Sequence, residues 1–327
     1  MSRKVLFLGG TGTISWWCVQ AALEAGWHVT VVGRGSAKIR QLPDAAELVR
    51  ADVRDPAGLA EALGKREFDA VTDFLTYDVD RLRSNVEVLG ERIGQYVFIS
   101  SASAYQKPVG SLPITESTPL VNPFWQYSRD KIACEDYLIG LARERGYPAT
   151  IVRPSHTYDA ASHVTMGGWT DILRMREGLP VIVHGDGTSL WHLTHASDFA
   201  YCFQRLLGER RALANAYHIT GDEVLTWNAI YAELAAAAGV AQPKLVHLAS
   251  ETIAKLMPEA VGTLIGDKAH SVMFDNSKVR ALATGFAQRV TWADGARQYV
   301  EFQDGHPDWA ARSAEWDALS DRLAALA

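Results

Sequence analysis

The most restrictive feature of the sequence is an apolar segment that runs directly into a glycine-rich turn. Residues 4–8 read KVLFL, residues 9–15 read GGTGTIS, and a helix-compatible segment from Trp16 to Ala25 precedes a second apolar segment, His28 to Val32. Glycines let the backbone approach a pyrophosphate, and the N-terminus of the following helix faces its negative charge. This order predicts a strand, glycine turn, helix, strand unit that binds a dinucleotide.

Apolar and helix-compatible segments continue to alternate along the chain. Further strands are expected at residues 47–53, 69–75, 95–101 and 149–153, and helices at residues 56–64, 79–92 and 127–145. This alternation favours a parallel sheet covered on both faces. We expect the α/β class, with a Rossmann-type doubly wound parallel sheet in residues 1–155. Residues 156–327 are expected to form mainly a smaller α/β C-terminal lobe that binds substrate, with some elements returning to the sheet.

The second half of the chain is less regular. Helices are expected at residues 167–177, 197–207, 226–238, 290–301 and 308–326, and strands at residues 180–184, 216–220 and 244–248. A further strand from Val272 is expected to feed a short helix. In the last helix one face carries Trp309, Trp316, Leu319, Leu323 and Leu326. This stripe predicts core or dimer packing.

Composition and charge exclude several classes of function. The 327 residues are 48% hydrophobic with a formal net charge of -6, which permits a large core and disfavours a general nucleic-acid binder. Cys18, Cys134 and Cys202 are isolated in apolar helical segments, so buried free thiols in a reducing compartment are expected. No signal peptide or apolar segment of membrane-spanning length is recognised. We therefore expect a cytoplasmic protein with a small-molecule substrate and no membrane or nucleic-acid partner.

A second motif lies in the helix expected at residues 127–145. A spacing of four places Tyr127 and Lys131 on one face of that helix, one turn apart. A neighbouring ammonium favours the phenolate and lowers the pKa of a tyrosine, which is otherwise near ~10. Ser101, at the end of a preceding strand, could hydrogen-bond the substrate oxygen whose proton is transferred. The pair alone has a second interpretation, because such pairs also occur on solvated helices.

The glycine-rich turn, the serines of residues 100–103 and the Tyr127-x-x-x-Lys131 pair together resemble the extended short-chain dehydrogenase/reductase family. Its best known members are NAD-dependent nucleotide-sugar epimerases and dehydratases. The resemblance implies that Tyr127 exchanges the alcohol proton, that Lys131 also holds the nicotinamide ribose, and that Ser101 orients the substrate oxygen. It further implies an enzyme that transfers hydride at a secondary alcohol or ketone of a carbohydrate-like substrate, nucleotide sugars included, and a homodimer.

The same resemblance assigns a cofactor site. Cofactor contacts are expected from Gly9, Gly12, Thr13, Ile14, Arg34, Asp52, Lys131 and Pro154. Gly33 takes the place of the acidic residue that binds the ribose 2′-hydroxyl of NAD, and Arg34 can pair with a 2′-phosphate, so NADP is preferred over NAD. Arg34 could instead stack on the adenine or face solvent. Asp52 would contact the adenine amine, and the alternative, a helix cap, suits Asp55 better.

Ser103, His156 and Trp191 are expected at the substrate. Dehydratases of the family carry Thr-Asp-Glu where this chain has Ser101-Ala102-Ser103, which disfavours dehydration. Trp191 takes the place of an arginine that grips the diphosphate in nucleotide-sugar enzymes, and an indole is suited instead to stacking on an apolar sugar face or an aromatic ring. His156 is either an acid–base group or a hydrogen-bonded wall residue.

Several further side chains are candidates for the same pocket. The missing arginine could be replaced by Arg174, Arg176, Lys278 or Arg280, and Glu116, Lys268 and His270 could enter the site. His192 and His195 lie three residues apart, but no third ligand has a matching spacing. We therefore expect no metal site.

Two reactions and one non-catalytic function remain open. An epimerase transfers hydride twice on one bound substrate, whereas a net dehydrogenase or reductase transfers it once and releases the cofactor. The family resemblance favours an epimerase, whereas Gly33 and Arg34 favour a reductase. The alternative is a non-catalytic nucleotide-binding or RNA-binding protein on the same fold, since plastid RNA-binding proteins related to the family share the Gly-Gly-Thr-Gly start. The intact set of Ser101, Tyr127 and Lys131 favours an enzyme, because a scaffold has no chemical need for all three.

Overall fold

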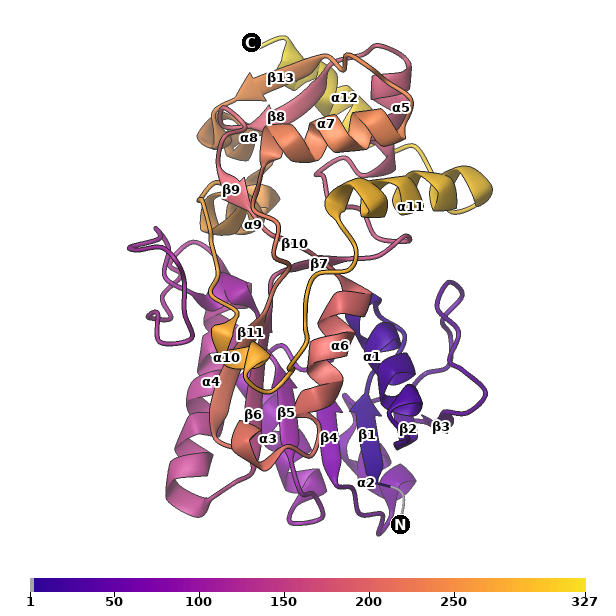
Figure 1. Cartoon of the computed structure of the whole chain (residues 1–327), viewed down its shortest axis with the longest axis vertical. Helices are drawn as coiled ribbons and strands as arrows, with labels where there is room; N and C mark the ends of the chain where they lie inside the picture. Colours follow the sequence, from indigo (N-terminus) through magenta and orange to yellow (C-terminus); the bar gives the residue numbers. More distant parts are fainter. Residues whose placement is uncertain (1–2) are drawn as a thin grey trace.

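In the computed structural model, which describes residues 3–327, a seven-stranded parallel sheet forms the larger part of the molecule (Figure 1). Its strands are β1 (Lys4–Leu8), β2 (His28–Gly33), β3 (Glu47–Arg50), β4 (Ala70–Asp73), β5 (Tyr96–Ile99), β6 (Ala149–Pro154) and β11 (Asn215–Ile219). Their order is β11-β6-β5-β4-β1-β2-β3, and every neighbouring pair is parallel. The chain order reverses between β4 and β1, and ligands of open α/β sheets bind outside the carboxyl ends of the strands at such a point.

Helices cover both faces of this sheet. α1 (Thr13–Glu24) and α6 (Ala196–Leu206) pack together and share one core with the sheet, to which Cys18 and Phe203 belong. α2 (Pro56–Leu63), α3 (Val79–Leu89) and α4 (Gln126–Arg145) enclose the other core, with Leu82 and Cys134. Burial on both faces explains the nearly continuous apolar strands. Cys18, Cys134 and Cys202 are buried free thiols, which confirms that expectation.

Pairs of short strands and a group of helices build the C-terminal lobe. β8 (Val181–His184) pairs with β13 (Leu245–Leu248), β9 (Leu190–Trp191) with β12 (Leu225–Thr226), and β7 (His156–Tyr158) with β10 (Leu193–His195). The helices of the lobe are α5 (Trp169–Arg176), α7 (Trp227–Ala237), α8 (Ser250–Leu256), α9 (Val261–Thr263), α11 (Trp292–Gly305) and α12 (Ala314–Ala324). α10 (Ser277–Arg280) instead packs beside β11 of the large sheet (Figure 1). Short helical turns are η3 (Pro258–Ala260) and η4 (Leu264–Lys268) in the lobe, η1 (Ala102–Ala104) after β5 and η2 (Arg210–Ala212) before β11. No helix within residues 3–327 combines the length and the apolarity needed to cross a membrane.

Two predictions for the C-terminal lobe were wrong. The last helix begins only after Ser313, whose hydroxyl caps it by accepting from the N–H of Trp316, so Trp309 lies outside the helix. Trp309 is exposed, whereas Trp316 is buried, and the two do not share a helical face. The strand expected from Val272 is also not formed, because Phe274 makes an isolated bridge with Ile114 instead of pairing along a ladder.

Candidate active site

The glycine-rich turn connects β1 to α1 at the carboxyl edge of the sheet. Gly9 has a φ of 83°, a conformation that residues with a Cβ rarely adopt. A Cβ on Gly10 would lie 2.7 Å from Val31 Cγ1 on β2, which is too close. Gly12 is the N-cap of α1, and its N–H donates to Ser15 Oγ at 3.0 Å. Ser15, which replaces a glycine of the dinucleotide fingerprint, therefore helps to hold the turn.

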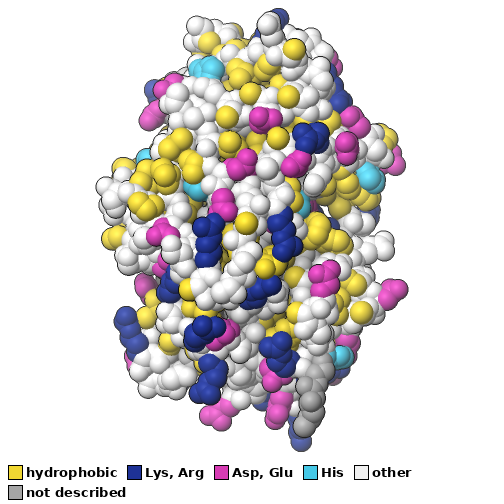
Figure 2. Space-filling view, in the orientation of Figure 1, with side chains coloured by type: hydrophobic (Ala, Val, Ile, Leu, Met, Phe, Trp, Pro, Cys, Tyr) yellow, Lys and Arg dark blue, Asp and Glu magenta, His cyan; other side chains and the backbone are white. Residues whose placement is uncertain are grey.

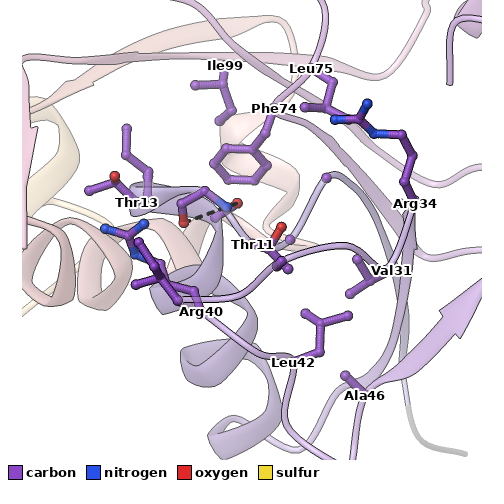
Figure 3. Close-up of a pocket in the computed structure, with 18 of the residues that line it drawn as sticks. Thr11, Thr13, Val31, Arg34, Arg40, Leu42, Ala46, Phe74, Leu75 and Ile99 are labelled. Atoms are coloured by element: carbon purple, nitrogen blue, oxygen red, sulfur yellow. Dashed lines mark hydrogen bonds between the residues drawn. The ribbon is translucent and has the colours of Figure 1, made fainter. Parts of the chain in front are cut away.

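A cavity of about 1180 Å³ lies over this turn (Figure 3). Its walls come from the turn, the loop after β2, the β4–α3 turn and the beginning of α4. Of the expected cofactor residues it is lined by Gly9, Gly12, Thr13, Ile14, Arg34, Lys131 and Pro154. The bare backbone of the turn, the helix N-terminus and the large volume fit a nicotinamide dinucleotide.

The loop of residues 34–46 closes the outer side of this large cavity. Arg40 donates to Asp159 at 2.6 and 2.8 Å and to Ser162 at 2.9 Å, which ties the loop to the segment after β7. Thr13, at the start of α1, shares a hydrogen bond of 2.7 Å with the same Ser162 hydroxyl. Arg34 is exposed on the cavity wall, and Figure 3 shows it across the glycine turn from Arg40. Asp159 therefore neutralises Arg40, whereas the Arg34 side chain faces the ligand space.

Asp52 lies outside the large cavity, unlike the other expected cofactor residues. β3 ends at Arg50, so Asp52 belongs to the following turn, where Arg54 binds both of its carboxylate oxygens. These hydrogen bonds hold the pKa of the Asp52 carboxyl well below its usual range. A contact between Asp52 and the adenine stays a prediction, and it would compete with Arg54.

A buried carboxylate that the sequence did not single out fixes another wall of the cavity. Asp73, at the end of β4, accepts hydrogen bonds of 3.0 Å from the N–H groups of Leu75 and Thr76 and from Asn85. These bonds hold the β4–α3 turn, whose Leu75 and Tyr77 line the cavity. The only sequence signal for this role is an aspartate at the end of an apolar strand.

Lys131 lies one turn into α4, and its ammonium is fixed beneath the large cavity. It donates to the carbonyl oxygens of Thr76 at 2.6 Å and Ile99 at 2.8 Å. Burial lowers the pKa of Lys131 to about 8. An ammonium has three donors, so one remains for a ligand in the cavity that Lys131 lines.

Tyr127 lies at the boundary between the large cavity and a smaller one, and it lines both. Burial raises the pKa of its phenol to about 12, an effect partly offset by a hydrogen bond with Ser101. The prediction that Lys131 lowers this pKa was wrong, because the ammonium is bound by two carbonyl groups and lies 5.8 Å from the centre of the Tyr127 ring. At neutral pH Tyr127 is therefore a protonated acid.

Ser101 and Ser103 belong to a chain of hydroxyl groups beside Tyr127. The Oγ atoms of Ser101 and Ser103 lie 2.9 Å apart, and Ser103 Oγ lies 2.8 Å from Ser128 Oγ on α4. Asn122 donates to the Ser103 carbonyl oxygen at 2.9 Å and holds this segment in place. Ser101 is half-buried at the smaller cavity, whereas Ser103 is 4% exposed. Ser101 can thus meet a ligand, and Ser103 positions it.

The smaller cavity, of about 290 Å³, extends from Tyr127 into the C-terminal lobe. His156 and Trp191 line it, and Trp191 Nε1 donates to His156 Nδ1 at 3.1 Å. Because Nδ1 accepts this bond, the proton of the neutral imidazole lies on Nε2. Burial holds the pKa of His156 well below its usual range. His156 is therefore a neutral hydrogen-bond donor at neutral pH and not a general base.

The basic residues considered as replacements for the missing arginine are engaged elsewhere. Aspartates bind Arg174, Arg176 and Arg280. Neither these arginines nor Lys278, Glu116 and His270 line the smaller cavity. The lysines that line it are Lys268 and Lys107, and Lys107 carries no motif that would mark it in the sequence. Within residues 3–327 no group of three or more His, Cys, Asp or Glu side chains is placed to hold a metal ion.

Comparison with known proteins agrees with this geometry. Residues 5–220 match the NAD dependent epimerase/dehydratase family. The chain belongs to this family. Among its relatives, the chloroplast stem-loop binding protein of 41 kDa b of Arabidopsis thaliana is 27% identical over 75% of this chain and 66% of its own length. The 2′-dehydrokanamycin reductase of Streptomyces kanamyceticus is 26% identical over 70% of this chain and 64% of its own length, so the match spans just under two thirds of either relative.

A solved structure of the family shows the same fold. The UDP-glucuronic acid 4-epimerase from Bacillus cereus, in complex with UDP-glucuronic acid and NAD, matches with a TM-score of 0.74 and 18% identity, over 92% of this chain and 99% of that one. This likeness confirms the Rossmann-type α/β class. The relatives and structural neighbours include epimerases, dehydratases and reductases, and NAD is bound in the solved structures of this epimerase and of a dTDP-glucose 4,6-dehydratase from Streptomyces venezuelae.

Proposed function

We propose that the protein is an NAD(P)-dependent oxidoreductase or epimerase that transfers hydride at a secondary alcohol or ketone of a carbohydrate-like substrate. One observation supports this most directly: Tyr127 lines both the large cavity over the glycine turn and the smaller cavity. Lys131 lines the first cavity, and Ser101 lines the second. A proton donor at this junction meets a cofactor and a substrate at the same time.

A nicotinamide bound in the large cavity would supply or accept the hydride. The phenol of Tyr127, protonated because its pKa is raised to about 12, can donate its proton to a ketone oxygen as negative charge develops there. Ser101 Oγ can donate a second hydrogen bond to the same oxygen and hold the carbonyl in place. Lys131, which two carbonyl groups hold in place, offers its remaining donor to a ribose hydroxyl and so would position the nicotinamide.

Dehydration is not supported by the residues beside Tyr127. The positions that carry acids in the family's dehydratases hold Ala102 and Ser103, and Ser103 is bonded within the hydroxyl chain. Asp267 is the carboxylate among the residues that line the smaller cavity, and Lys107 lies 3.4 Å from it. An acid paired in this way is poorly suited to eliminate water. The proposal is therefore limited to oxidation, reduction and epimerisation.

NADP is the cofactor that we propose, with NAD as the alternative. Gly33 offers no carboxylate to a ribose 2′-hydroxyl, and Arg34 and Lys38 bring two positive charges to the cavity wall beyond β2, against one negative charge from Asp44. A 2′-phosphate gains from charge-assisted hydrogen bonds to such groups. NADP exchanged at each turnover would make the protein a dehydrogenase or reductase, whereas NAD retained after purification would make it an epimerase.

The test is replacement of Tyr127 by phenylalanine. NADPH binding is measured by titration calorimetry, and turnover is followed by NADPH absorbance with a panel of keto sugars. We expect Tyr127→Phe to lower turnover by roughly 10²-fold or more, the usual loss when an acid–base group is removed, without weakening NADPH binding. Tyr137→Phe is the matched control, since Tyr137 lies on the same helix away from both cavities. Unchanged turnover in Tyr127→Phe would sink the proposed role.

A second candidate is RNA binding without catalysis, which the match to the chloroplast stem-loop binding protein favours. On the face drawn in Figure 2, Lys and Arg side chains lie mainly over the half that contains the large sheet, with acidic side chains among them. The net charge of -6 opposes a broad RNA surface. Tight binding of a labelled RNA hairpin at physiological salt, together with no turnover, would favour this function. The homodimer and the cytoplasmic location stay predictions.

A further inference from the structure

A buried lysine in the smaller cavity has no part in the proposed hydride transfer. Lys107 lies in the loop between β5 and α4, its side chain is 1% exposed, and it lines the cavity together with Ser101 and Tyr127. Its Nζ lies 3.4 Å from Asp267 Oδ1, and within residues 3–327 this Nζ makes no hydrogen bond. A buried ammonium that keeps its donors unused is costly, so the donors indicate a missing partner.

Lys131 provides an internal comparison. It is as deeply buried as Lys107, at 2% exposure for each residue. Two carbonyl oxygens, at 2.6 and 2.8 Å, accept from the Lys131 ammonium. The fold therefore provides backbone acceptors for the ammonium of a buried lysine that has a fixed position. Around Lys107 the fold supplies one carboxylate at ion-pair distance. The N–H donors of the Lys107 ammonium are therefore available to a ligand bound in the cavity.

The charges around the smaller cavity are not balanced. Its lining contains two lysines, Lys107 and Lys268, against one carboxylate, Asp267. His156 and His192 also line it, and burial lowers the pKa of both imidazoles, so they stay neutral at neutral pH. The lining residues therefore carry one excess positive charge when both lysines are protonated. Burial also lowers the pKa of Lys268, so a bound oxyanion would stabilise its ammonium form.

The size of the cavity limits what can carry this negative charge. At about 290 Å³ it lies at the lower end of the range for small-molecule sites, ~300–1,000 Å³. The adjoining cavity, which shares His192 and Phe274 with it, is lined by Asp222 and Asp275, and its Arg280 is already paired with Asp222. Two aspartates against one paired arginine disfavour a diphosphate there.

We propose that Lys107 and Lys268 bind an oxyanion of the substrate, and that this substrate is a monosaccharide-sized molecule with a carboxylate or phosphate group and no nucleotide. The inference rests on the proposed function, since it names the substrate class of the same site. The single excess charge favours a carboxylate over a phosphate. Trp191, which stands where nucleotide-sugar enzymes carry an arginine, fits this assignment because it orients the His156 donor instead of binding a diphosphate.

The test is calorimetric titration of the full-length protein in saturating NADP with D-glucuronate, glucose 6-phosphate, glucose and UDP-glucose. We expect at least one of the two compact anions to bind, and glucose and UDP-glucose to bind roughly tenfold more weakly or not at all, since a hydrogen bond to a charged group is typically worth that factor or more. The better of D-glucuronate and glucose 6-phosphate identifies the carboxylate or the phosphate as the bound group.

Two variants with opposite expected effects separate recognition from misfolding. Lys107→Met is expected to weaken binding of the anion roughly tenfold or more, while Asp267→Asn removes the competing carboxylate and is expected to tighten it several-fold. Lys255→Met, which removes an exposed lysine of α8, is the control and leaves binding unchanged. Failure of a variant to fold would weaken binding and could not produce the tighter binding expected of Asp267→Asn.

Each of three binding results would overturn the inference: no binding of either compact anion, equal binding of glucose, or tighter binding of UDP-glucose than of both compact anions. The readout is binding and not turnover. A Tyr127→Phe variant that keeps its turnover would therefore refute the proposed role of Tyr127 as proton donor while leaving this result unaffected. Anion binding lost in both Lys107→Met and Asp267→Asn, with NADP binding intact, would also contradict it.

Discussion

Replacement of Glu135 by glutamine is expected to lower the free energy of unfolding by about 3–5 kcal/mol, the usual cost of breaking a buried ion pair from one side. Glu135 lies one turn after Lys131 on α4 and is 0% exposed. Its carboxylate accepts three hydrogen bonds of 2.6 to 3.2 Å from Arg153 on β6, and another from Ser100. Glutamine keeps the shape but leaves the Arg153 guanidinium, 3% exposed, without its counter-charge.

The assay is urea unfolding followed by circular dichroism, with the midpoint and slope compared between variants. Glu209→Gln is the matched control, because its partner Arg211 has a side chain that is 67% exposed, and such surface pairs contribute about 0–1 kcal/mol. The double variant Glu135→Leu with Arg153→Met should recover most of the loss, since it removes both charges. A loss in Glu135→Gln no larger than that in Glu209→Gln would refute the view that this ion pair holds α4 against the sheet.

Two further predictions concern cofactor choice and acid stability. Arg34→Ala is expected to weaken NADPH binding about tenfold or more and to leave NADH binding unchanged, because only the 2′-phosphate of NADPH loses a partner. Equal losses of affinity for NADPH and NADH in calorimetry would contradict this. Stability is expected to fall as the pH drops from 6.5 towards 4. Burial lowers the pKa of His184 to about 4, so between these pH values the unfolded chain binds a proton that the folded protein does not. The free energy of unfolding therefore falls by up to roughly 1.4 kcal/mol for each pH unit. In His184→Gln this slope should be shallower, and an unchanged slope in urea unfolding would argue against it.

The local sequence was sufficient for the framework of the sheet. Of the first six strands, all except the edge strand β3 are short, mainly apolar segments bounded by turn or helix residues, and such a run indicates burial on two faces without any knowledge of neighbours. The glycine turn could also be predicted from the sequence. Gly9 adopts a positive φ, and Gly10 lies so close to Val31 that a Cβ would not fit. The positions of Tyr127 and Lys131 on one face of α4 follow from helix geometry alone.

Predictions that depended on element ends were less secure. The strand that carries Asp52 was expected to reach residue 53, but β3 stops at Arg50 and Arg54 binds the Asp52 carboxylate. Trp309 was expected on the last helix, but Ser313 caps that helix four residues later. In both cases a local side-chain hydrogen bond fixed the boundary, and apolar spacing carries no information on such bonds.

The electrostatic character of the site was decided only by the tertiary structure. Sequence spacing suggested that Lys131 lowers the pKa of Tyr127. In the structure, however, the carbonyl groups of Thr76, in the turn after β4, and Ile99, at the end of β5, hold the ammonium, and burial raises the phenol pKa. Lys107 and Asp267 lie far apart in the chain and meet in the smaller cavity. Burial and the distance between charges depend on which distant segments pack together, so the sequence could predict which side chains are present near the active site but not their charge state or their partners.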